Sequence, residues 1–172
     1  MNYATIKYND VSNGPGIRTS LFVSGCTHRC KGCFNSVAWD FDYGEKYTKE
    51  TEDELIASLN SPFVKGITLL GGEPFEPQNQ EELLKLTERI RREMPDKTIW
   101  CFSGYTIEEM LTGRLSSCPT TLPLLKNIDV LVDGRFIEEE KSLMLKFKGS
   151  KNQRTILVGE TLARGQITLL YD

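Results

Sequence analysis

The sequence predicts an α/β fold in which helices cover a parallel β-sheet, and two observations support this prediction. Short apolar, strand-like runs alternate with amphipathic, helix-like segments along most of the chain. Each strand-like run is followed directly by a turn that contains glycine, as expected where a buried strand ends and a crossover begins. Because crossovers between parallel strands are right-handed, such units curl into either a doubly wound sheet or an incomplete (βα) barrel.

The expected elements begin after an N-terminal segment of uncertain form. Residues 18–24 are rich in β-branched and aromatic side chains and run into Gly25, which predicts the first strand of the series. Thr51 and Glu54 match the capping-box pattern, which predicts a helix over 52–60. This strand and helix make the first βα unit.

The later units repeat this order. Residues 66–70 form a short apolar run that predicts a strand. Asn79 with Glu82 predicts the start of a helix that reaches Glu93 and stops before Pro95. The remaining expected elements are a strand over 97–102, a helix over 106–111, a strand over 128–132 and a terminal hairpin within 155–172.

Length and charge restrict the class of protein. A chain of 172 residues can bury a substantial core, so we expect a single domain over 1–172. The net charge of −3 gives no basic footprint for nucleic acid, and no apolar stretch approaches the length of a membrane span. Since no apolar N-terminal segment resembles a signal peptide, we expect a soluble, cytoplasmic protein.

Three cysteines lie close together in the run Cys-Thr-His-Arg-Cys-Lys-Gly-Cys. Cys26, Cys30 and Cys33 supply soft thiolate ligands, which suit iron–sulfur clusters and zinc. A cubane cluster of four irons is usually held by four thiolates, so three thiolates leave one iron able to bind another ligand. An open metal position is typical of a site that performs chemistry.

Zinc and disulfides are the competing interpretations of these cysteines. A structural zinc site needs four ligands, no second Cys-x-x-Cys pair follows, and we interpret the sole histidine, His28, as a solvated loop residue. The odd number of five cysteines does not indicate disulfides. We interpret Cys101 as a core residue of an apolar strand and Cys118 as a loop residue without assigned reactivity. A cluster is the favoured interpretation, and zinc stays open.

Four turns are expected at one edge of the sheet, because ligands bind at the carboxyl ends of the strands in both candidate architectures. The cysteine loop follows the first strand, and Gly-Gly-Glu-Pro, Ser-Gly-Tyr and Asp-Gly-Arg turns follow the next three. Paired glycines let backbone approach a ligand, and the carboxylate of Glu73 could bind an ammonium group. The alternative is a tight turn with an exposed acid. The candidate residues are Gly71, Gly72, Glu73, Ser103, Tyr105, Asp133 and Arg135.

These motifs resemble those of the radical S-adenosylmethionine (radical SAM) enzymes, in which Cys-x-x-x-Cys-x-x-Cys is followed by a Gly-Gly-Glu-Pro type segment. The resemblance implies a partial (βα) barrel with a [4Fe-4S] cluster on Cys26, Cys30 and Cys33. It also implies S-adenosyl-L-methionine as the second cofactor. In that family the reduced cluster donates an electron to the sulfonium, and a 5'-deoxyadenosyl radical then removes a hydrogen atom from the substrate.

Longer segments resemble, more narrowly, the activating proteins of anaerobic ribonucleoside-triphosphate reductase. These segments are 13–26, 31–35, 130–136 and 148–154. The resemblance implies that the substrate is a glycine Cα–H in the large subunit of that reductase, where a glycyl radical is installed. It further implies a low-potential electron donor such as flavodoxin.

Carried over residue by residue, the resemblance implies that Gly71, Gly72 and Glu73 bind the methionine end of S-adenosylmethionine. The residues that would position the cofactor or the partner peptide are Ser103, Tyr105, Asp133 and Arg135. One departure is Gly32, since superfamily members often carry an aromatic residue there beside the adenine, whereas this chain has Phe34 after the third cysteine. The open alternatives are another radical SAM enzyme, such as the activase of pyruvate formate-lyase or one acting on a small molecule, and a non-catalytic zinc or iron–sulfur binding module.

Overall fold

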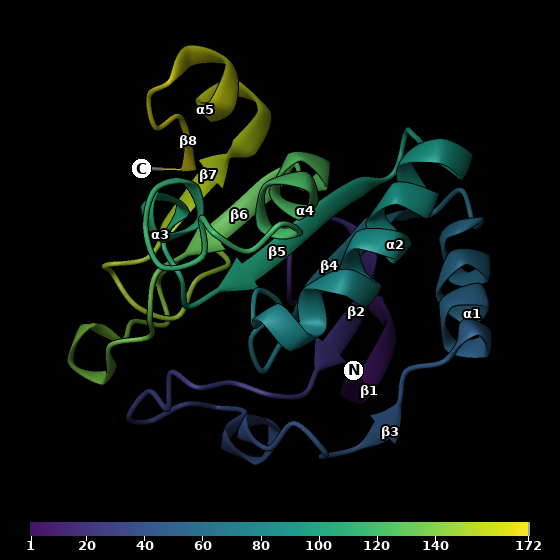
Figure 1. The fold of residues 1–172 in the computed structure, drawn as a ribbon, viewed down its shortest axis with the longest axis horizontal. Coiled ribbons are helices and arrows are strands. Elements are labelled where there is room, and N and C mark those ends of the chain that lie inside the picture. The colour runs from purple at the N-terminus through teal and green to yellow at the C-terminus, as the bar shows by residue number, and fades with distance from the viewer. Residues whose placement is uncertain (172) are drawn as a thin grey trace.

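A computed structural model describes residues 1–171 and contains one eight-stranded sheet (Figure 1). The strands are β1 (Asn2–Asp10), β2 (Ile17–Val23), β3 (Glu45–Lys46), β4 (Val64–Gly71), β5 (Thr98–Ser103), β6 (Val130–Asp133), β7 (Arg154–Leu157) and β8 (Leu169–Tyr171). The helices are α1 (Lys49–Leu59), α2 (Pro77–Glu93), α3 (Ile107–Leu111), α4 (Thr121–Asn127) and α5 (Val158–Arg164), with short 3₁₀ turns η1 (Ser36–Trp39) and η2 (Glu138–Glu140). The strand order is β3-β1-β2-β4-β5-β6-β7-β8.

The sheet is mixed, which corrects the expectation of a parallel sheet. Its centre, β2-β4-β5-β6, is parallel as predicted, whereas β1, β3, β7 and β8 pair antiparallel at the two sides. A short connection can return a chain only as an antiparallel neighbour. The turn over 11–16 between β1 and β2 is such a connection, and the sequence pattern did not identify β1.

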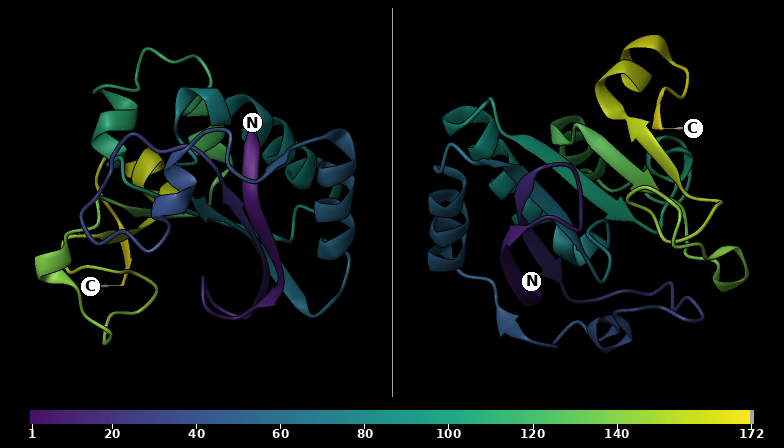
Figure 2. Two further views of the ribbon diagram at one scale, coloured as in Figure 1. Left: turned by 90° about the horizontal axis from the view of Figure 1, so that it is seen from below. Right: turned by 180° about the vertical axis from the view of Figure 1, so that it is seen from behind.

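The parallel strands lie in the sheet in the same order as in the sequence, which excludes the doubly wound alternative. Right-handed crossovers that always advance in one direction place their helices on one face of the sheet. Figures 1 and 2 show α1, α2 and α4 on the same side, and no α-helix of the described residues covers the opposite face. A doubly wound sheet would carry helices on both faces.

Side chains of the central strands alternate between the two faces. Leu69 and Leu131 lie in the apolar core under the helices. The other face carries Arg18, Thr68 and Trp100, and the fully buried guanidinium of Arg18 donates to Thr68 Oγ1 at 2.8 Å. Burial lowers the pKa of Arg18 to about 10, so the side chain stays charged at neutral pH. The helix-free face is therefore polar around Arg18 and Thr68.

The first two major helices begin earlier than predicted. Helix α1 begins at Lys49, because the capping box is formed by Thr48 and Thr51 rather than by Thr51 and Glu54. Helix α2 begins at Pro77, and proline is favoured at the first helical position because its missing N–H needs no partner there. Asn79 is therefore not a cap; it lies inside the first turn and its side-chain amide donates to backbone carbonyls.

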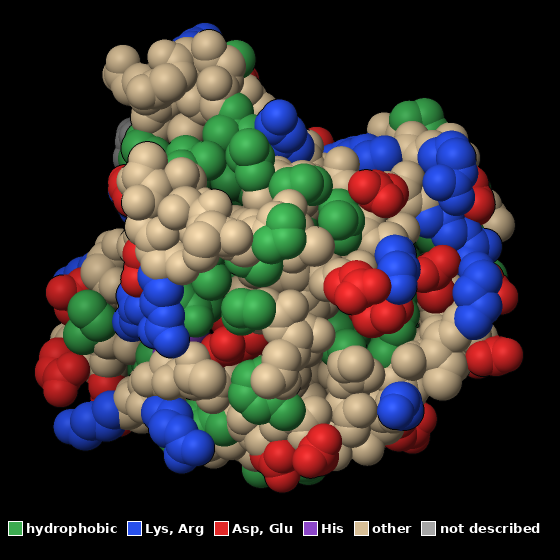
Figure 3. Space-filling view, viewed as in Figure 1, with side chains coloured by type: hydrophobic (Ala, Val, Ile, Leu, Met, Phe, Trp, Pro, Cys, Tyr) green, Lys and Arg blue, Asp and Glu red, His purple; other side chains and the backbone are tan. Residues whose placement is uncertain are grey.

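Charged residues of both signs cover the outer surface of α1 and α2 (Figure 3). Arg89 of α2 contacts Glu52 of α1 at 2.9 Å and Asp53 at 2.6 Å, so ion pairs join the two helices. Asp53 is exposed, and exposed ion pairs add little stability singly, whereas Arg89 and Glu52 are largely buried. Among the described residues no helix is both long and apolar enough to cross a membrane.

The C-terminal segment forms the predicted antiparallel pair, but its connection differs. Strands β7 and β8 are paired, and helix α5 lies between them instead of a tight turn. Gly165 ends α5 in the left-handed conformation, with φ +67°. Asp172, the last residue of the predicted hairpin, lies outside the described residues.

Candidate functional site

A cavity of about 460 Å³ lies at the carboxyl ends of the parallel strands, as the order of the turns predicted. All four turns reach it: the cysteine loop after β2, the glycine pair after β4, the turn after β5 and Gly134 after β6. Seven of the predicted residues line the cavity: Cys26, Cys30, Cys33, Gly71, Gly72, Glu73 and Ser103.

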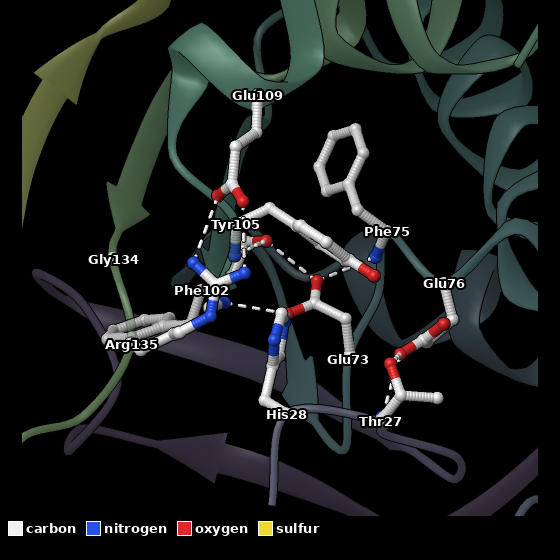
Figure 4. Close-up of polar contacts among 12 residues, drawn as sticks. Thr27, His28, Glu73, Phe75, Glu76, Phe102, Tyr105, Glu109, Gly134 and Arg135 are labelled. Carbon is white, nitrogen blue, oxygen red and sulfur yellow. Dashed lines mark hydrogen bonds and ion pairs between the residues drawn. The ribbon is translucent and has the colours of Figure 1, made fainter. Parts of the chain in front are cut away.

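The other predicted residues, Tyr105, Asp133 and Arg135, do not line this cavity. Tyr105 is buried behind it and packs edge-on against His28, with ring centroids 4.4 Å apart. Arg135 forms two hydrogen bonds with Glu109, at 3.0 and 3.1 Å, and lies over the Tyr105 ring (Figure 4). These contacts support the turns that border the cavity.

Asp133 is a buried structural acid. Its Oδ1 accepts a hydrogen bond from Arg154 Nε at 2.9 Å, and its Oδ2 accepts from the Ile107 backbone at 2.8 Å. Arg154 also contacts Glu108, which lies on α3. The Arg154 hydrogen bond and charge hold the pKa of Glu108 below its usual value. Asp133 thus ties β7 and α3 to the end of β6.

We expect Arg154→Ala to destabilise the protein by about 2 kcal/mol, because it leaves the buried Asp133 carboxylate without its charge partner. The estimate is below the value for fully buried pairs, since the Arg154 side chain is partly exposed. Urea unfolding would measure the change. Arg164→Ala is the matched control, because its pair with Glu160 is exposed and 3.7 Å long. Equal losses in the two variants would contradict this account.

Glu73 is the polar centre of the cavity wall. Its Oε1 accepts hydrogen bonds from the Phe75 backbone at 2.8 Å and from Ser103 Oγ at 2.7 Å. Its Oε2 accepts from the Gly104 backbone at 2.6 Å and lies 2.9 Å from His28 Nε2 (Figure 4). The side chain is 1% exposed, so the alternative of a turn with an exposed acid is wrong. A carboxylate offers about four lone-pair positions, and protein groups approach all of them here.

His28 is buried, which corrects its interpretation as a solvated residue. Its side chain is 5% exposed and lies between Glu73 and the Tyr105 ring. A Cβ atom at Gly104 would lie 2.5 Å from the imidazole, so the close approach requires glycine at that position. The sequence carried no local signal for this contact, because His28 and Glu73 are 45 residues apart.

The first half of the cysteine loop is also fixed to the segment after β4. Thr27 donates from its backbone and its hydroxyl to Glu76 Oε1, at 2.8 and 2.6 Å (Figure 4). The backbone of Glu73 donates to the Gly25 carbonyl at 2.8 Å. A Cβ atom at Gly72 would lie 2.6 Å from that same carbonyl oxygen. The glycine pair therefore lets the two loops pack backbone against backbone.

The three cavity cysteines have free thiols. Cys26 is buried, and burial raises the pKa of its thiol to about 12; burial also raises the pKa of Cys30. Within the described part of the chain, no three His, Cys, Asp or Glu side chains are grouped as ligands of one ion. A cubane binds each cysteine at a different iron, so its ligands need not converge on one point. Three soft thiols beside an open cavity fit such a cluster.

The structure explains the absence of an aromatic residue before the third cysteine. Gly32 has φ +75°, and a Cβ atom there would lie 2.8 Å from a carboxylate oxygen of Glu138. The positive φ strains a bulky side chain at this position, whereas the exposed carboxylate of Glu138 could move aside. Other aromatic side chains that the sequence did not assign to the site line the cavity instead: Phe34, Trp39, Phe102, Phe136 and Phe147.

Comparisons with known proteins support an iron–sulfur cofactor. A family model described as a 4Fe-4S single cluster domain matches residues 12–156, which places the chain in the class of iron–sulfur cluster proteins. Anaerobic ribonucleoside-triphosphate reductase-activating proteins are similar over most of the chain. The relative from Vibrio cholerae is 45% identical over 89% of this chain and 96% of its own length, and that from Escherichia coli strain K12 is 43% identical with the same coverage. The relative from Enterobacteria phage T4 is 40% identical over 90% of this chain and 92% of its own length. The chain belongs to the family of anaerobic ribonucleoside-triphosphate reductase-activating proteins.

Proposed function

We propose that this protein is a radical SAM activase of anaerobic ribonucleoside-triphosphate reductase. Cys26, Cys30 and Cys33 would hold a [4Fe-4S] cluster with one open iron, and S-adenosylmethionine would bind in the adjoining cavity. The reaction would remove a hydrogen atom from a glycine Cα in the large subunit of the reductase and leave a glycyl radical there. The observation that carries the proposal is the meeting of three free thiols with the glycine pair in one cavity.

The cluster would supply the electron that splits a carbon–sulfur bond of S-adenosylmethionine, and the chain would bind and orient the reactants. Glu73 accepts from four protein groups, so we assign the methionine ammonium to backbone carbonyls at Gly71 and Gly72 rather than to the Glu73 carboxylate. A backbone carbonyl is a good acceptor for an ammonium donor. Glu73 would then act by positioning the loops.

The helix-free face would serve as the inner wall of a partial (βα) barrel, with residues 1–172 acting as a single radical SAM domain. The strand order supports this architecture because it leaves one face of the sheet open. In a barrel that is open on one side, a radical is exposed to water unless another molecule covers the opening. A large protein substrate would cover it and exclude water.

An anaerobic assay tests the proposal. The protein would be reconstituted with iron and sulfide, reduced, and mixed with S-adenosylmethionine and a large reductase subunit that carries deuterated glycine. We expect 5'-deoxyadenosine that contains deuterium and a glycyl radical signal in electron paramagnetic resonance. A low-potential protein such as flavodoxin should replace the chemical reductant.

The other outcomes separate the alternatives. Cleavage without deuterium transfer from the reductase, but with transfer from labelled pyruvate formate-lyase or a small molecule, would assign a different radical SAM substrate. Tightly bound zinc with no cleavage would indicate a non-catalytic module and overturn the proposal.

A further inference from the structure

A loop beside the cavity holds apolar side chains in solvent. This rim loop comprises residues 141–150, between η2 and β7. Its two ends are joined by the antiparallel bridge between Lys141 and Ser150, and the Lys151 backbone donates to Glu140 at 3.0 Å. At its tip Leu143 and Met144 are 92% and 93% exposed. Large apolar side chains without cover at the mouth of a cavity indicate a contact surface.

The rim loop is anchored at its base. The Phe147 ring lies edge-on to Trp100 of β5, with centroids 5.7 Å apart, and Lys148 Nζ donates to the Gln153 carbonyl at 2.9 Å. Lys141, Leu143 and Phe147 line the cavity. The loop is therefore fixed to the inner face of the sheet, while Leu143 and Met144 at its tip remain exposed.

The second half of the cysteine loop adds to the same rim. Phe34 follows the third cysteine and is 70% exposed. Its ring lies 5.7 Å from that of Phe136, and Lys141 Nζ lies 4.8 Å above it. Phe34 and the rim loop thus form one surface, which contains both cavity wall and exposed apolar tip.

This surface is basic as well as apolar. The rim loop contains three lysines and no acidic residue, although the whole chain has a net charge of −3. In Figure 3 the lower left, where Figure 1 places the segment after β6, shows hydrophobic side chains beside charged side chains of both signs. A complementary partner carries apolar residues flanked by acidic ones.

We propose that the rim loop and Phe34 dock an acidic and apolar segment of the protein substrate, and so guide its reactive glycine into the cavity. This inference rests on the proposed function. A hydrogen on a protein backbone can reach the cavity only if that backbone crosses the rim, whereas a small ligand would sit inside the cavity and leave the tip uncovered. The lysines would accelerate the encounter, and the apolar tip would slow dissociation.

The variant Met144→Asp tests the docking surface. Met144 is 93% exposed and does not line the cavity, so the change adds negative charge at the apolar tip without altering the cavity wall. The control is Phe63→Asp, because Phe63 is 74% exposed and precedes β4, at the amino ends of the parallel strands. Three quantities would be measured for each protein: S-adenosylmethionine cleavage without partner, the dissociation constant for the large reductase subunit, and the amount of glycyl radical formed on it.

We expect Met144→Asp to cleave S-adenosylmethionine alone at the wild-type rate, to bind the large subunit at least about tenfold more weakly, and to form correspondingly less glycyl radical. Phe63→Asp should match wild type in all three. Higher salt should weaken wild-type binding more than binding of a Lys146→Gln variant.

Unchanged affinity of Met144→Asp, or an equal loss in Phe63→Asp, would overturn the docking proposal while leaving the proposed function intact. Conversion of a wild-type dimer to a monomer with unchanged reductase affinity would assign the surface to a second copy of the chain and overturn it too. If the wild-type protein does not cleave S-adenosylmethionine at all, the proposed function is wrong, and the docking proposal is wrong with it.

Discussion

Replacement of Cys30 by alanine is expected to abolish cluster binding and S-adenosylmethionine cleavage while leaving the fold intact. The thiol is half-buried in a loop and lines the cavity, so its removal deletes a ligand without opening a hole in the core. Two remaining thiolates are too few to hold a cubane stably. Iron and sulfide content, visible absorption and 5'-deoxyadenosine would be measured after anaerobic reconstitution. We expect all to fall to background, with a change in unfolding free energy of at most about 0.5 kcal/mol.

Cys118→Ala is the matched control for this variant. Cys118 is also half-buried, but it lies before α4 and contacts Gln80 and Thr120 instead of the cavity. It should keep the full cluster and the full cleavage activity. Retention of iron by Cys30→Ala, or loss of iron in Cys118→Ala, would show that the ligand set differs from the proposed one.

The parallel centre of the sheet could be predicted because each of its strands is a short apolar run followed by a glycine turn. Strand β1 could not be predicted in this way. Only Asp10 of its nine residues is buried, so the strand lacks an apolar pattern. Helix α4 contains Pro123, which normally breaks helices. In the first turn proline is tolerated, because the N–H groups there have no partner within the helix.

The site was predictable where local sequence determines the backbone, and less so where tertiary contacts decide. The glycine pair and the cysteine spacing place their own loops at the cavity. Asp133, in contrast, lies on the same side of β6 as Leu131, which faces the helices. Gly134 lines the cavity, and Asp133 does not. Because side chains on both faces of β6 are buried, its sequence does not indicate which of them face the helices and which face the cavity side of the sheet.

Glu73→Gln is expected to destabilise the protein by about 3 kcal/mol, even without cofactor, because Glu73 joins the cysteine loop to the turns after β4 and β5. Both carboxylate oxygens of Glu73 accept hydrogen bonds from protein donors. A glutamine amide has only one acceptor oxygen, and its NH₂ group would face donors that then have no acceptor. Buried donors left without acceptors cost about 1–3 kcal/mol each. The melting temperature should fall by roughly 10 °C. Thermal unfolding and urea unfolding of the cofactor-free protein would measure the change.

Glu76→Gln separates this role from a general effect of removing a buried acid near the cysteines. Both Thr27 donors contact the single oxygen Oε1 of Glu76, so a glutamine can keep that oxygen in place and turn its NH₂ group away. Its loss should stay below about 1 kcal/mol. If Glu73→Gln instead unfolds like wild type and only weakens S-adenosylmethionine binding, the carboxylate is a direct ligand of the ammonium group. A large loss of stability without cofactor means that Glu73 acts by holding the cysteine loop against the cavity wall, so the cluster and S-adenosylmethionine share one support.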